Sequence, residues 1–410
     1  MKHRIIVLGA GYTGAVAAGR IAKRLHRDDV DITLVNAEPD FVERVRMHQV
    51  AVGQNLKPRP FSEMFAGTGV ELRLARVNSV DVDRRTVSVV DANGGANGDS
   101  NGDAEELEYD TLVYALGSGW NDLGVPGVAE HAYEIAGRPG ALRLRERLAA
   151  LSAGQPVVVV GGGLTGVEAA TEIAEARPDL AVALVARGGL GDWLSDKGRA
   201  HLRKVTDKLG ITVHEHAAVT GVEADRVTFA DGETVPAAVT VWTAGFAVHP
   251  IAQATTLDVT GTGQIVVDRT MRSVSHPDVY AIGDAAMAMG PGDKPLRMAC
   301  ASGVPAAWQA ADAIAARLVG RKVPSTSIRY FNQCISLGRG EGLIQYVTAD
   351  DRAVNAALTG RLAALYKEVV CKGAAWGVAN PTMGLPTRRR RVVAAREAVV
   401  PSGSAAEATV

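Results

Sequence analysis

The feature that most constrains this chain is a glycine-rich turn that occurs twice, each time after a short apolar strand and before a predicted helix. The first turn spans residues 9–14 and follows the apolar run 5–8, and the second spans residues 161–166 and follows the apolar run 157–160. Both fit the GxGxxG spacing of dinucleotide-binding βαβ units. Their first glycines are 152 residues apart, which is the scale of a domain and not of a short repeat. The chain is therefore predicted to contain two nucleotide-binding domains.

Each glycine of the first turn has a separate steric role. Gly9 allows a tight turn, Gly11 lets the backbone approach a pyrophosphate, and Gly14 lets the helix pack close to the strand. The free N–H groups and the positive dipole end of the following helix attract phosphates. The residues of this turn that are predicted to contact the cofactor are Gly9, Gly11, Tyr12, Thr13 and Gly14.

The second turn repeats the pattern, and acidic residues follow it. Glu168 and Glu172 are four residues apart, so they share one face of the predicted helix. Glu168 is predicted either to face the nicotinamide or its ribose, as a catalytic residue, or to be one of two carboxylates on that helix face. The residues predicted to bind the second cofactor at this turn are Gly161, Gly163, Leu164, Thr165 and Gly166.

The two units differ where their second strands end, which is the usual place for an acidic ribose ligand. The first unit has Asn36 there, followed by Ala37 and Glu38. The amide oxygen of Asn36 can accept a ribose hydroxyl, and Glu38 is an alternative ligand. The second unit has Arg187, with no acid before Asp192. Because a guanidinium matches phosphate oxygens, this favours NADPH or the use of both nucleotides.

Composition narrows the class of protein further. The chain has 410 residues, which predicts two or three domains, and its net charge of −1 gives no basic field for nucleic acid. Its three cysteines are Cys300, Cys334 and Cys371, without a CxxC pair, which argues against a disulfide scaffold or a structural zinc site. The early apolar run is too short for a signal peptide, and no run is long enough to span a membrane, so we expect a cytoplasmic protein. Residues 91–108 are low in complexity and are predicted to form a loop without a site.

Three further motifs complete a family pattern. A buried strand at 279–282 ends at Gly283 and Asp284, where a helix start is expected and a carboxylate can bind a ribityl hydroxyl. Residues 114–118, which include Ala115 and Gly117, and residues 242–245, which end at Gly245, resemble two versions of one motif. Together with the glycine turns, these motifs resemble the two-dinucleotide-binding-domain flavoproteins of the pyridine nucleotide–disulfide oxidoreductase superfamily.

This resemblance implies an α/β fold and two cofactors. Non-covalent FAD is expected in a domain of residues 1–119 and 262–322, NAD(P)H in residues 120–261, and a C-terminal α+β module in residues 323–410. Without a redox cysteine pair, the disulfide reductases are excluded. The motifs look most like type II NADH dehydrogenases and the related apoptosis-inducing-factor-2-like reductases. Those enzymes pass electrons from NAD(P)H through FAD to a quinone.

Two alternatives remain open for the electron acceptor. The Gln-rich motif of the quinone site would fall near residues 297–309, where this chain has Met-Ala-Cys-Ala-Ser-Gly at 298–303. One alternative is therefore a biosynthetic or ferredoxin-type flavin reductase with a small-molecule or protein acceptor other than a quinone. The other is an NAD(P)H-sensing flavoprotein. Residues 362–379 are predicted to be part of a packed C-terminal module in preference to an amphipathic surface helix, although peripheral membrane contact and a homodimer are both compatible with the sequence.

Several single residues carry narrower predictions. Arg44 or Arg46 is predicted to balance the charge of the FAD pyrophosphate or of the reduced flavin, with a solvated helix face as the alternative. His48 is a candidate proton donor near the acceptor, although a lone histidine more often packs or caps. Cys300 is interpreted as a small buried side chain near the flavin. The run Arg388–Arg391 is interpreted as a solvated tail, with a patch for anionic lipid or a partner as the alternative.

Overall fold

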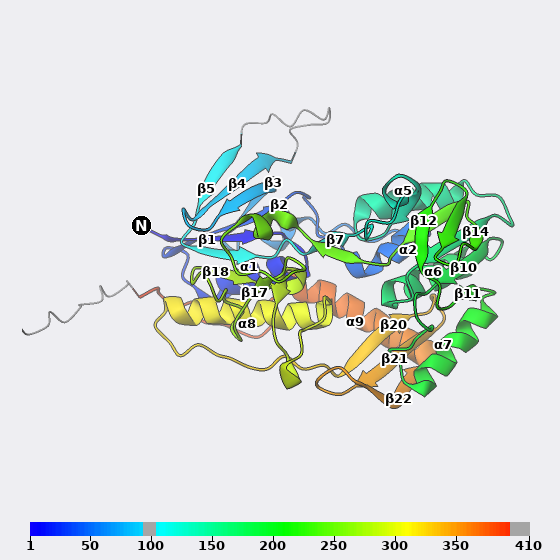
Figure 1. The fold of residues 1–410 in the computed structure, drawn as a ribbon. Coiled ribbons are helices and arrows are strands. Elements are labelled where there is room, and N and C mark those ends of the chain that lie inside the picture. Colours follow the sequence, from blue (N-terminus) through cyan, green and yellow to red (C-terminus); the bar gives the residue numbers. More distant parts are fainter. Residues whose placement is uncertain (93–103, 394–410) are drawn as a thin grey trace, which may run out of the picture.

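A computed structural model describes residues 1–92 and 104–393 of the chain. Most of the predicted low-complexity loop, and the residues that follow position 393, lie outside the described part. Figure 1 shows two α/β lobes, one built around β1 and the other around β10, with a small sheet of β20 to β22 and the helix α9 running below and between them.

The first lobe is built on a seven-stranded sheet. Its order is β18-β6-β1-β2-β3-β4-β5, parallel from β18 to β3 and antiparallel from there on. The helices α1 and α8 pack against each other beside it (Figure 1). The elements are β1 (His3–Leu8), α1 (Tyr12–Arg24), β2 (Val30–Asn36), β3 (Val70–Asp81), β4 (Thr86–Asp91), β5 (Glu105–Glu108), β6 (Thr111–Tyr114), β18 (Val279–Ala281) and α8 (Cys300–Leu318).

The second lobe has a five-stranded parallel sheet of order β11-β10-β9-β15-β8. Its central strand is apolar throughout because both faces of a parallel sheet are covered by helices. A three-stranded antiparallel sheet lies at its side. The elements are β8 (Ala132–Glu134), α5 (Arg138–Ala149), β9 (Pro156–Val160), α6 (Leu164–Ala176), β10 (Ala181–Val185), α7 (Asp196–Lys208), β11 (Thr212–His214), β12 (Val219–Val222), β13 (Arg226–Phe229), β14 (Thr234–Pro236) and β15 (Val239–Trp242).

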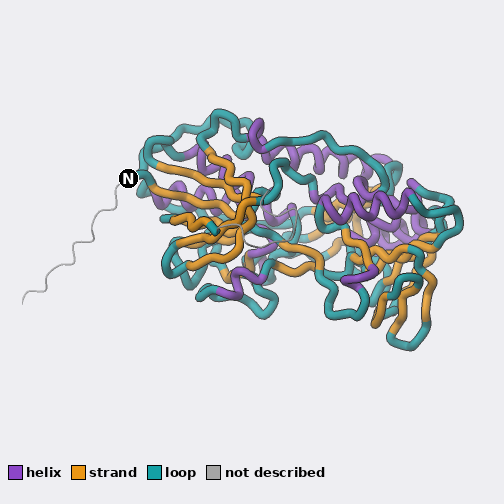
Figure 2. Tube along the Cα trace, turned by 90° about the horizontal axis from the view of Figure 1, so that it is seen from above, coloured by secondary structure: helices purple, strands orange, loops and turns teal. Residues whose placement is uncertain are grey.

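A two-stranded antiparallel ribbon joins the lobes. It pairs β7 (Ser118–Trp120) with β16 (Phe246–Val248), so the chain leaves the first sheet after β6 and returns after β15. Figure 2, which views the molecule from above, shows the two lobes side by side with this connection between them. The outgoing and returning strands follow the two related motifs at 114–118 and 242–245. The domain limits at 119/120 and 261/262 stay a prediction.

The C-terminal part contacts both lobes. It consists of β20 (Asn332–Ser336), β21 (Gly342–Val347), β22 (Ala353–Thr359) and α9 (Arg361–Ala379), and α9 packs on α1 as well as on this sheet. No helix within the described residues is both long and apolar enough to cross a membrane. The remaining short elements are η1 (Arg44–Arg46), α2 (Met47–Ala51), α3 (Phe61–Met64), α4 (Val128–His131), η2 (Pro250–Ala254), β17 (Ile265–Val266), η3 (Gly283–Ala285), β19 (Ala286–Met287) and η4 (Pro291–Asp293).

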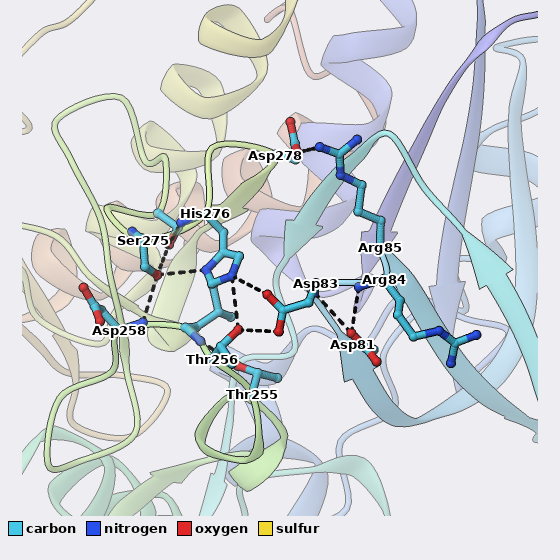
Figure 3. Close-up of polar contacts among 12 residues, drawn as sticks. Asp81, Asp83, Arg84, Arg85, Thr255, Thr256, Asp258, Ser275, His276 and Asp278 are labelled. Carbon is cyan, nitrogen blue, oxygen red and sulfur yellow. Dashed lines mark hydrogen bonds and ion pairs between the residues drawn. The ribbon is translucent and has the colours of Figure 1, made fainter.

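A polar cluster fixes the turn between β3 and β4 to the body of the first lobe (Figure 3). His276 Nε2 lies 3.3 Å from Asp83 Oδ1, and Thr256 Oγ1 donates to Asp83 Oδ2 at 3.0 Å. Next to them, Arg85 forms an ion pair of 2.6 Å with Asp278. These contacts tie three loops together at the surface, so we assign this cluster a structural role.

Candidate active site

The first glycine turn has the geometry that its sequence predicts. Gly9 has a φ of +89°, and a Cβ there would lie 2.5 Å from the carbonyl oxygen of Ala115. A Cβ on Gly14 would lie 1.8 Å from the carbonyl oxygen of Gly9. In contrast, a Cβ on Gly11 would have no atom within 4 Å. The space in front of Gly11 is therefore an open cradle, and no side chain caps the N-terminus of α1 behind it, so N–H groups remain for a pyrophosphate.

The second glycine turn is constructed in the same way. Gly161 has a φ of +130°, and a Cβ there would lie 2.4 Å from Thr243 Oγ1. A Cβ on Gly166 would lie 1.8 Å from the carbonyl oxygen of Gly161, whereas a Cβ on Gly163 would have open space. Leu164 and Thr165 form the first turn of α6, which again has no side-chain cap. The chain therefore presents two equivalent anion-binding helix ends, one in each lobe.

The side chain of Asn36 is engaged with its own turn. Its Oδ1 accepts a hydrogen bond of 2.9 Å from the N–H of Ala10, and its Nδ2 donates to the carbonyl oxygen of Glu38 at 2.8 Å. These bonds fix the glycine turn to the turn after β2, which contains Ala37. An amide oxygen has a second lone pair, so the ribose contact stays a prediction with one acceptor site already in use.

Arg187, in contrast, is exposed just beyond β10, and within the described residues its side chain has no hydrogen bond or ion pair. The next acid, Asp192, accepts a 2.6 Å hydrogen bond from the N–H of Gly189 and lies 3.7 Å from Arg199. The carboxylate of Asp192 is thus occupied, and the guanidinium of Arg187 is the free charged group at this position.

The predicted flavin-side residues come together between the lobes. Ser118 Oγ donates a 2.6 Å hydrogen bond to Asp284 Oδ2, and Arg44 donates to Ser118 Oγ at 3.3 Å. Arg44 Nη1 also lies 3.9 Å from Asp284 Oδ2. Burial lowers the pKa of Arg44, and the nearby carboxylate of Asp284 opposes that shift. Gly117 lies beside the guanidinium of Arg44.

The expected helix start at Asp284 is wrong. Residues Gly283–Ala285 form one short 3-10 turn, and α8 begins only at Cys300. Gly283 has a φ of +71°, and a Cβ there would lie 2.9 Å from Thr13 Oγ1. Thr13 also packs against Gly303 at the start of α8. The turn at Gly283–Ala285 therefore contacts the first glycine turn through Thr13. The helix whose dipole acts next to Asp284 is α1 and not a helix that begins at Asp284.

The remaining predicted contacts play packing roles. The Tyr12 ring meets the Phe41 ring edge-on, with 4.9 Å between the ring centroids, and burial raises the pKa of Tyr12. Gly245 lies against Leu123 on the connection between the lobes. The cofactor contacts predicted for Tyr12 and Gly245 stay predictions.

A buried ion pair lies where α6, α9 and β20 meet. Glu168 Oε1 is 2.9 Å from Lys367 Nζ and accepts a 2.9 Å hydrogen bond from the N–H of Ser336. His48 Nδ1 lies 3.9 Å from the other oxygen of Glu168. Lys367 Nζ also donates to the carbonyl oxygen of Cys334 at 2.9 Å. The two predicted catalytic residues, Glu168 and His48, are thus neighbours, and Lys367 joins them.

The protonation of this group follows from burial and charge. Burial lowers the pKa of His48 to about 4, so its imidazole is neutral at pH 7. Burial also disfavours the charge of Lys367, but Glu168 together with the thiols of Cys371 and Cys334 outweighs burial, so the pKa of Lys367 is raised. The ammonium of Lys367 is consequently retained at neutral pH. Within the described residues, the second ring nitrogen of His48 has no hydrogen-bond partner.

Glu172, one turn beyond Glu168, is also buried. Gln54 Nε2 donates a 2.6 Å hydrogen bond to its Oε1, and within the described residues its Oε2 has no partner. Burial raises the pKa of Glu172 to about 7. This carboxyl group can therefore hold a proton at physiological pH.

Arg46 forms part of the wall next to His48, and its predicted alternative as a solvated residue is wrong. It is buried, and it pairs with Glu43 at 3.2 Å and with Glu368 of α9 at 3.0 Å. Burial disfavours the negative charge of Glu368, but Arg46 and Lys372 outweigh burial and lower the pKa of Glu368 to about 2. Arg46 therefore fixes α9 to the segment that carries His48.

The three cysteines, distant in sequence, converge on Lys367. The charge of Lys367 acts to lower the pKa of each thiol, but at Cys334 and Cys371 burial dominates and raises the pKa, to about 11 for Cys334. All three are free thiols. Cys371 is buried, but Cys300 is exposed, so the prediction of a buried Cys300 is wrong.

Sequence reasoning overlooked Lys367. The signal was available, because Ala363, Lys367, Cys371 and Ala375 recur every four residues and form the face of α9 that packs inward. A lysine on the buried face of a helix needs a charged partner. Only the tertiary structure identifies that partner as Glu168.

The other face of α9 contradicts the prediction of a fully packed C-terminal module. It exposes a stripe of apolar residues along the helix, ending with Trp376. The helix is amphipathic in an unusual sense: its inner face carries Lys367, and its outer face is apolar. The members of this outer stripe are Leu362, Leu365, Tyr366, Val369, Val370 and Trp376.

Comparison with known sequences agrees with this geometry. The profile of the family described as "Pyridine nucleotide-disulphide oxidoreductase" matches residues 3–315. The chain is 29% identical to NADH dehydrogenase-like protein Rv1812c of Mycobacterium tuberculosis, over 74% of this chain and 77% of that protein. It is 26% identical to demethylphylloquinone reductase NdbB of Synechocystis, over 70% of this chain and 72% of that protein. It is 28% identical to type II NADH:quinone oxidoreductase NdhA of Mycobacterium tuberculosis, over 69% of this chain and 66% of that protein.

Solved structures share the fold. NDH2 from Plasmodium falciparum in complex with NADH superposes with a TM-score of 0.75 at 15% identity, over 95% of this chain and 99% of that one. The sulfide:quinone oxidoreductase of Aquifex aeolicus gives a TM-score of 0.74 at 19% identity, over 93% of each chain. Both likenesses extend into the C-terminal sheet and α9, which the family profile does not cover.

Proposed function

This chain belongs to the pyridine nucleotide-disulphide oxidoreductase family and uses FAD and NAD(P)H, and from that premise we propose that it reduces a quinone. The predicted fold class and oxidoreductase activity are confirmed. The names of the relatives NdbB and NdhA support a quinone-type acceptor. The single observation that carries the proposal is the buried Glu168–Lys367 pair beside His48.

The residues present fit the two cofactors. The open cradle at Gly11 and the free end of α1 accommodate a pyrophosphate in the first lobe, and those at Gly163 and α6 do the same in the second. Next to each other, Arg44 supplies a positive charge and Asp284 a hydrogen-bonding carboxylate. When bound, FAD supplies the transfer of two electrons from NAD(P)H to the acceptor.

The protein's own contribution is to orient the acceptor and to provide charge and protons. Lys367 is held by Glu168 and by the carbonyl of Cys334, which fixes the direction of its ammonium. A fixed ammonium stabilises negative charge that develops on a carbonyl oxygen without reorganising during the reaction. Reducing a quinone with NAD(P)H takes up one proton from the medium. We assign Lys367 as the group that donates a hydrogen bond to the quinone oxygen. Glu168 is assigned as the residue that positions Lys367.

The free guanidinium of Arg187 supports NADPH as the electron donor. A 2′-phosphate at the end of β10 would meet this side chain, which has no competing acid among the described residues. A ribose without that phosphate would find no free carboxylate here. The enzyme is thus proposed to use NADPH in preference to NADH.

The apolar outer face of α9 supports peripheral contact with the cytoplasmic side of a membrane, where quinones are dissolved. Lys367 lies on the opposite face of the same helix, so docking of the outer stripe would bring the acceptor site close to the lipid. In this arrangement the helix lies in the interface and does not span the bilayer.

The proposal is tested with Lys367→Met, and with Lys372→Met as the matched control on the same helix. Loss of one fixed charge at the reacting oxygen should reduce kcat with a short-chain quinone by about 10²- to 10³-fold. Stopped-flow reduction of the bound flavin by NADPH should keep its native rate. The Lys372 variant should retain both rates, because that side chain is exposed.

Three results would contradict the proposal. One is native quinone turnover by Lys367→Met. Another is a native enzyme that reduces ferredoxin or a dye but not quinones, which would indicate a different acceptor. The third is slow flavin bleaching by NADPH with a stable charge-transfer complex and no turnover, which would indicate an NAD(P)H sensor.

A further inference from the structure

The segment after α9 folds back onto the C-terminal end of α1 and encloses a hollow. Arg390 pairs with Leu25 as a short parallel bridge, and Thr387 Oγ1 donates to the carbonyl oxygen of Lys23 at 3.1 Å. The backbone of this segment is therefore docked on α1, whereas the side chains of Arg388, Arg390 and Arg391 are exposed, in agreement with the prediction of a solvated charge run. The hollow is lined by Lys23, Asn380, Thr382, Leu385, Thr387 and Arg389, among others.

Positive charge without an acidic partner gathers at this hollow. Among the residues that the structure describes, the side chains of Lys23 and Arg388 have no hydrogen bond or ion pair. Arg389 uses its Nε for the carbonyl oxygen of Ala22 at 3.0 Å, which leaves its terminal nitrogens as free donors. Arg391 differs, because Asp29 and Asp28 neutralise it at 2.8 and 3.2 Å. Two uncompensated cations, Lys23 and Arg389, thus line one opening, and Arg388 is the chain neighbour of two lining residues.

The rim of the hollow is apolar and continues the outer stripe of α9. Trp376 is 46% exposed, Met383 49% and Leu385 69%. The Trp376 ring lies beside Gly384, and the Met383 sulfur lies beside Gly377, so the helix end and the following turn form one surface. Tryptophan favours the boundary between lipid and water. Most of the exposed face of α9 is apolar, and at its C-terminal end the free positive charges of Lys23 and Arg389 adjoin it.

We propose that this hollow binds the phosphate-bearing headgroup of an anionic phospholipid, with Lys23 and Arg389 as the cations of its lining and Arg388 as a further cation next to Arg389 in the chain. Trp376 and Leu385 then enter the boundary of the acyl chains. The proposal rests on the proposed membrane contact of α9 and adds a lipid specificity to it. The charge complementarity and the continuity with an apolar stripe favour a lipid over a soluble phosphate, which would gain nothing from the exposed Leu385.

The test is flotation of the FAD-loaded enzyme with two kinds of vesicle, pure phosphatidylcholine and a mixture of phosphatidylcholine with phosphatidylglycerol. The double variant Lys23→Glu/Arg388→Glu reverses one free cation of the lining and the free cation that neighbours Arg389 in the chain. It should weaken binding to the anionic vesicles by at least about 25-fold, from about fivefold for each cation lost near an anionic surface. Its binding to the neutral vesicles should be unchanged.

The matched control is Lys57→Glu/Lys204→Glu, which makes the same change in net charge at exposed positions outside the hollow. It should bind both kinds of vesicle nearly as the native enzyme does. The Lys23/Arg388 variant should also retain turnover with a soluble short-chain quinone, which shows that it is folded. Equal binding of that variant and the native enzyme to anionic vesicles would overturn the proposal.

A second double variant, Leu365→Glu/Val369→Glu, separates this proposal from the membrane contact itself. It should lose binding to both kinds of vesicle. If it does so while the Lys23/Arg388 variant is unaffected, the headgroup site is wrong and the docking of α9 stands. If the native enzyme binds no vesicle, both are wrong. Capture of polyglutamate in place of vesicles would identify an acidic protein segment as the occupant, and the lipid proposal would fail.

Discussion

The two glycine turns of this protein are sterically alike, but the helices and strands that follow them differ in charge. Both turns leave open space at the middle glycine and no room at the outer ones. After the first, Asn36 is bonded to its own turn, and α1 carries no acidic residue along its whole length. After the second, Arg187 is free, and α6 carries Glu168 and Glu172 into the buried junction of the lobes. We expect the turns to fix where phosphates bind and the flanking residues to decide which cofactor and which chemistry follow.

The largest expected effect is from valine at the middle glycine of each turn. Gly11→Val should fold but fail to retain FAD, because the new side chain fills an open cradle without meeting other atoms of the protein. Gly163→Val should stay yellow and bind NADPH about 10- to 100-fold more weakly, as is typical of overpacking at a contact surface. Flavin absorbance and NADPH titration distinguish the two.

A control for this comparison is Gly14→Ala. Its Cβ would lie 1.8 Å from the Gly9 carbonyl oxygen, so it should lower the melting temperature as well as the flavin content. A yellow Gly11→Val protein with normal turnover would refute the assignment of FAD to the first lobe.

The next effect concerns Glu172, a buried carboxyl group of α6 that has no counterpart in α1. The pKa of Glu172 is raised to about 7 in the folded protein, from an ordinary value of 4.5. Below about pH 4.5 both folded and unfolded chains are protonated, so the contribution of Glu172 to stability is fully present there. As the pH rises towards 7, the unfolded chain ionises first and stability falls by up to about 3 kcal/mol.

Glu172→Gln should remove this loss and flatten the free energy of unfolding between about pH 5 and 8, as measured by urea denaturation. The variant keeps the acceptor oxygen for Gln54. Glu146→Gln on α5, at an exposed position, should leave the pH dependence unchanged. An identical pH slope in the Glu172 variant and the native protein would mean that Glu172 is ionised when folded.

Arg187→Ala sharpens the comparison at the ends of the second strands. A charge-assisted contact to a 2′-phosphate contributes about 1.5 to 3 kcal/mol, so kcat/KM for NADPH should fall about 10- to 100-fold. The kcat/KM for NADH should be nearly the same in the variant and in the native enzyme. Arg203→Ala is a control on the neighbouring α7, because that side chain is bound to Glu215 at 2.6 Å. Should the native enzyme favour NADH strongly, the proposed role of Arg187 is wrong.

The smallest effect is expected at Asn36. Asn36→Ala removes two hydrogen bonds that fix the first glycine turn, which should cost about 1 kcal/mol of stability and weaken FAD binding about fivefold. Ser62→Ala is the control, since that side chain is exposed on α3 of the same lobe. Differential scanning calorimetry with and without added FAD measures both the stability and the FAD binding of each variant. Equal behaviour of the two variants would show that the turn is held without Asn36.

Much of the fold was predictable because glycine spacing acts locally. The tight turns at Gly9 and Gly161 follow from contacts within a few residues and with one neighbouring strand, and the apolar strands before them define the parallel sheets.

The candidate site was only partly predictable. Glu168, His48, Arg44 and Asp284 were recognised from their motifs, but the sequence contains no sign of which of them are neighbours. Glu168 and Lys367 are 199 positions apart, and their contact depends on α9 returning across both lobes. The burial of Arg46 and the exposure of Cys300 depend in the same way on elements far along the chain.

By itself, the sequence determined that this protein binds two dinucleotides on an α/β framework, because the steric demands of a glycine turn are met within the motif. The tertiary structure alone decided that a buried lysine faces Glu168, that three distant thiols share its field, and that Arg389 covers the end of α1 beside a cationic hollow. Ion pairs and surfaces require partners, and partners from separate segments are defined only when the chain has packed.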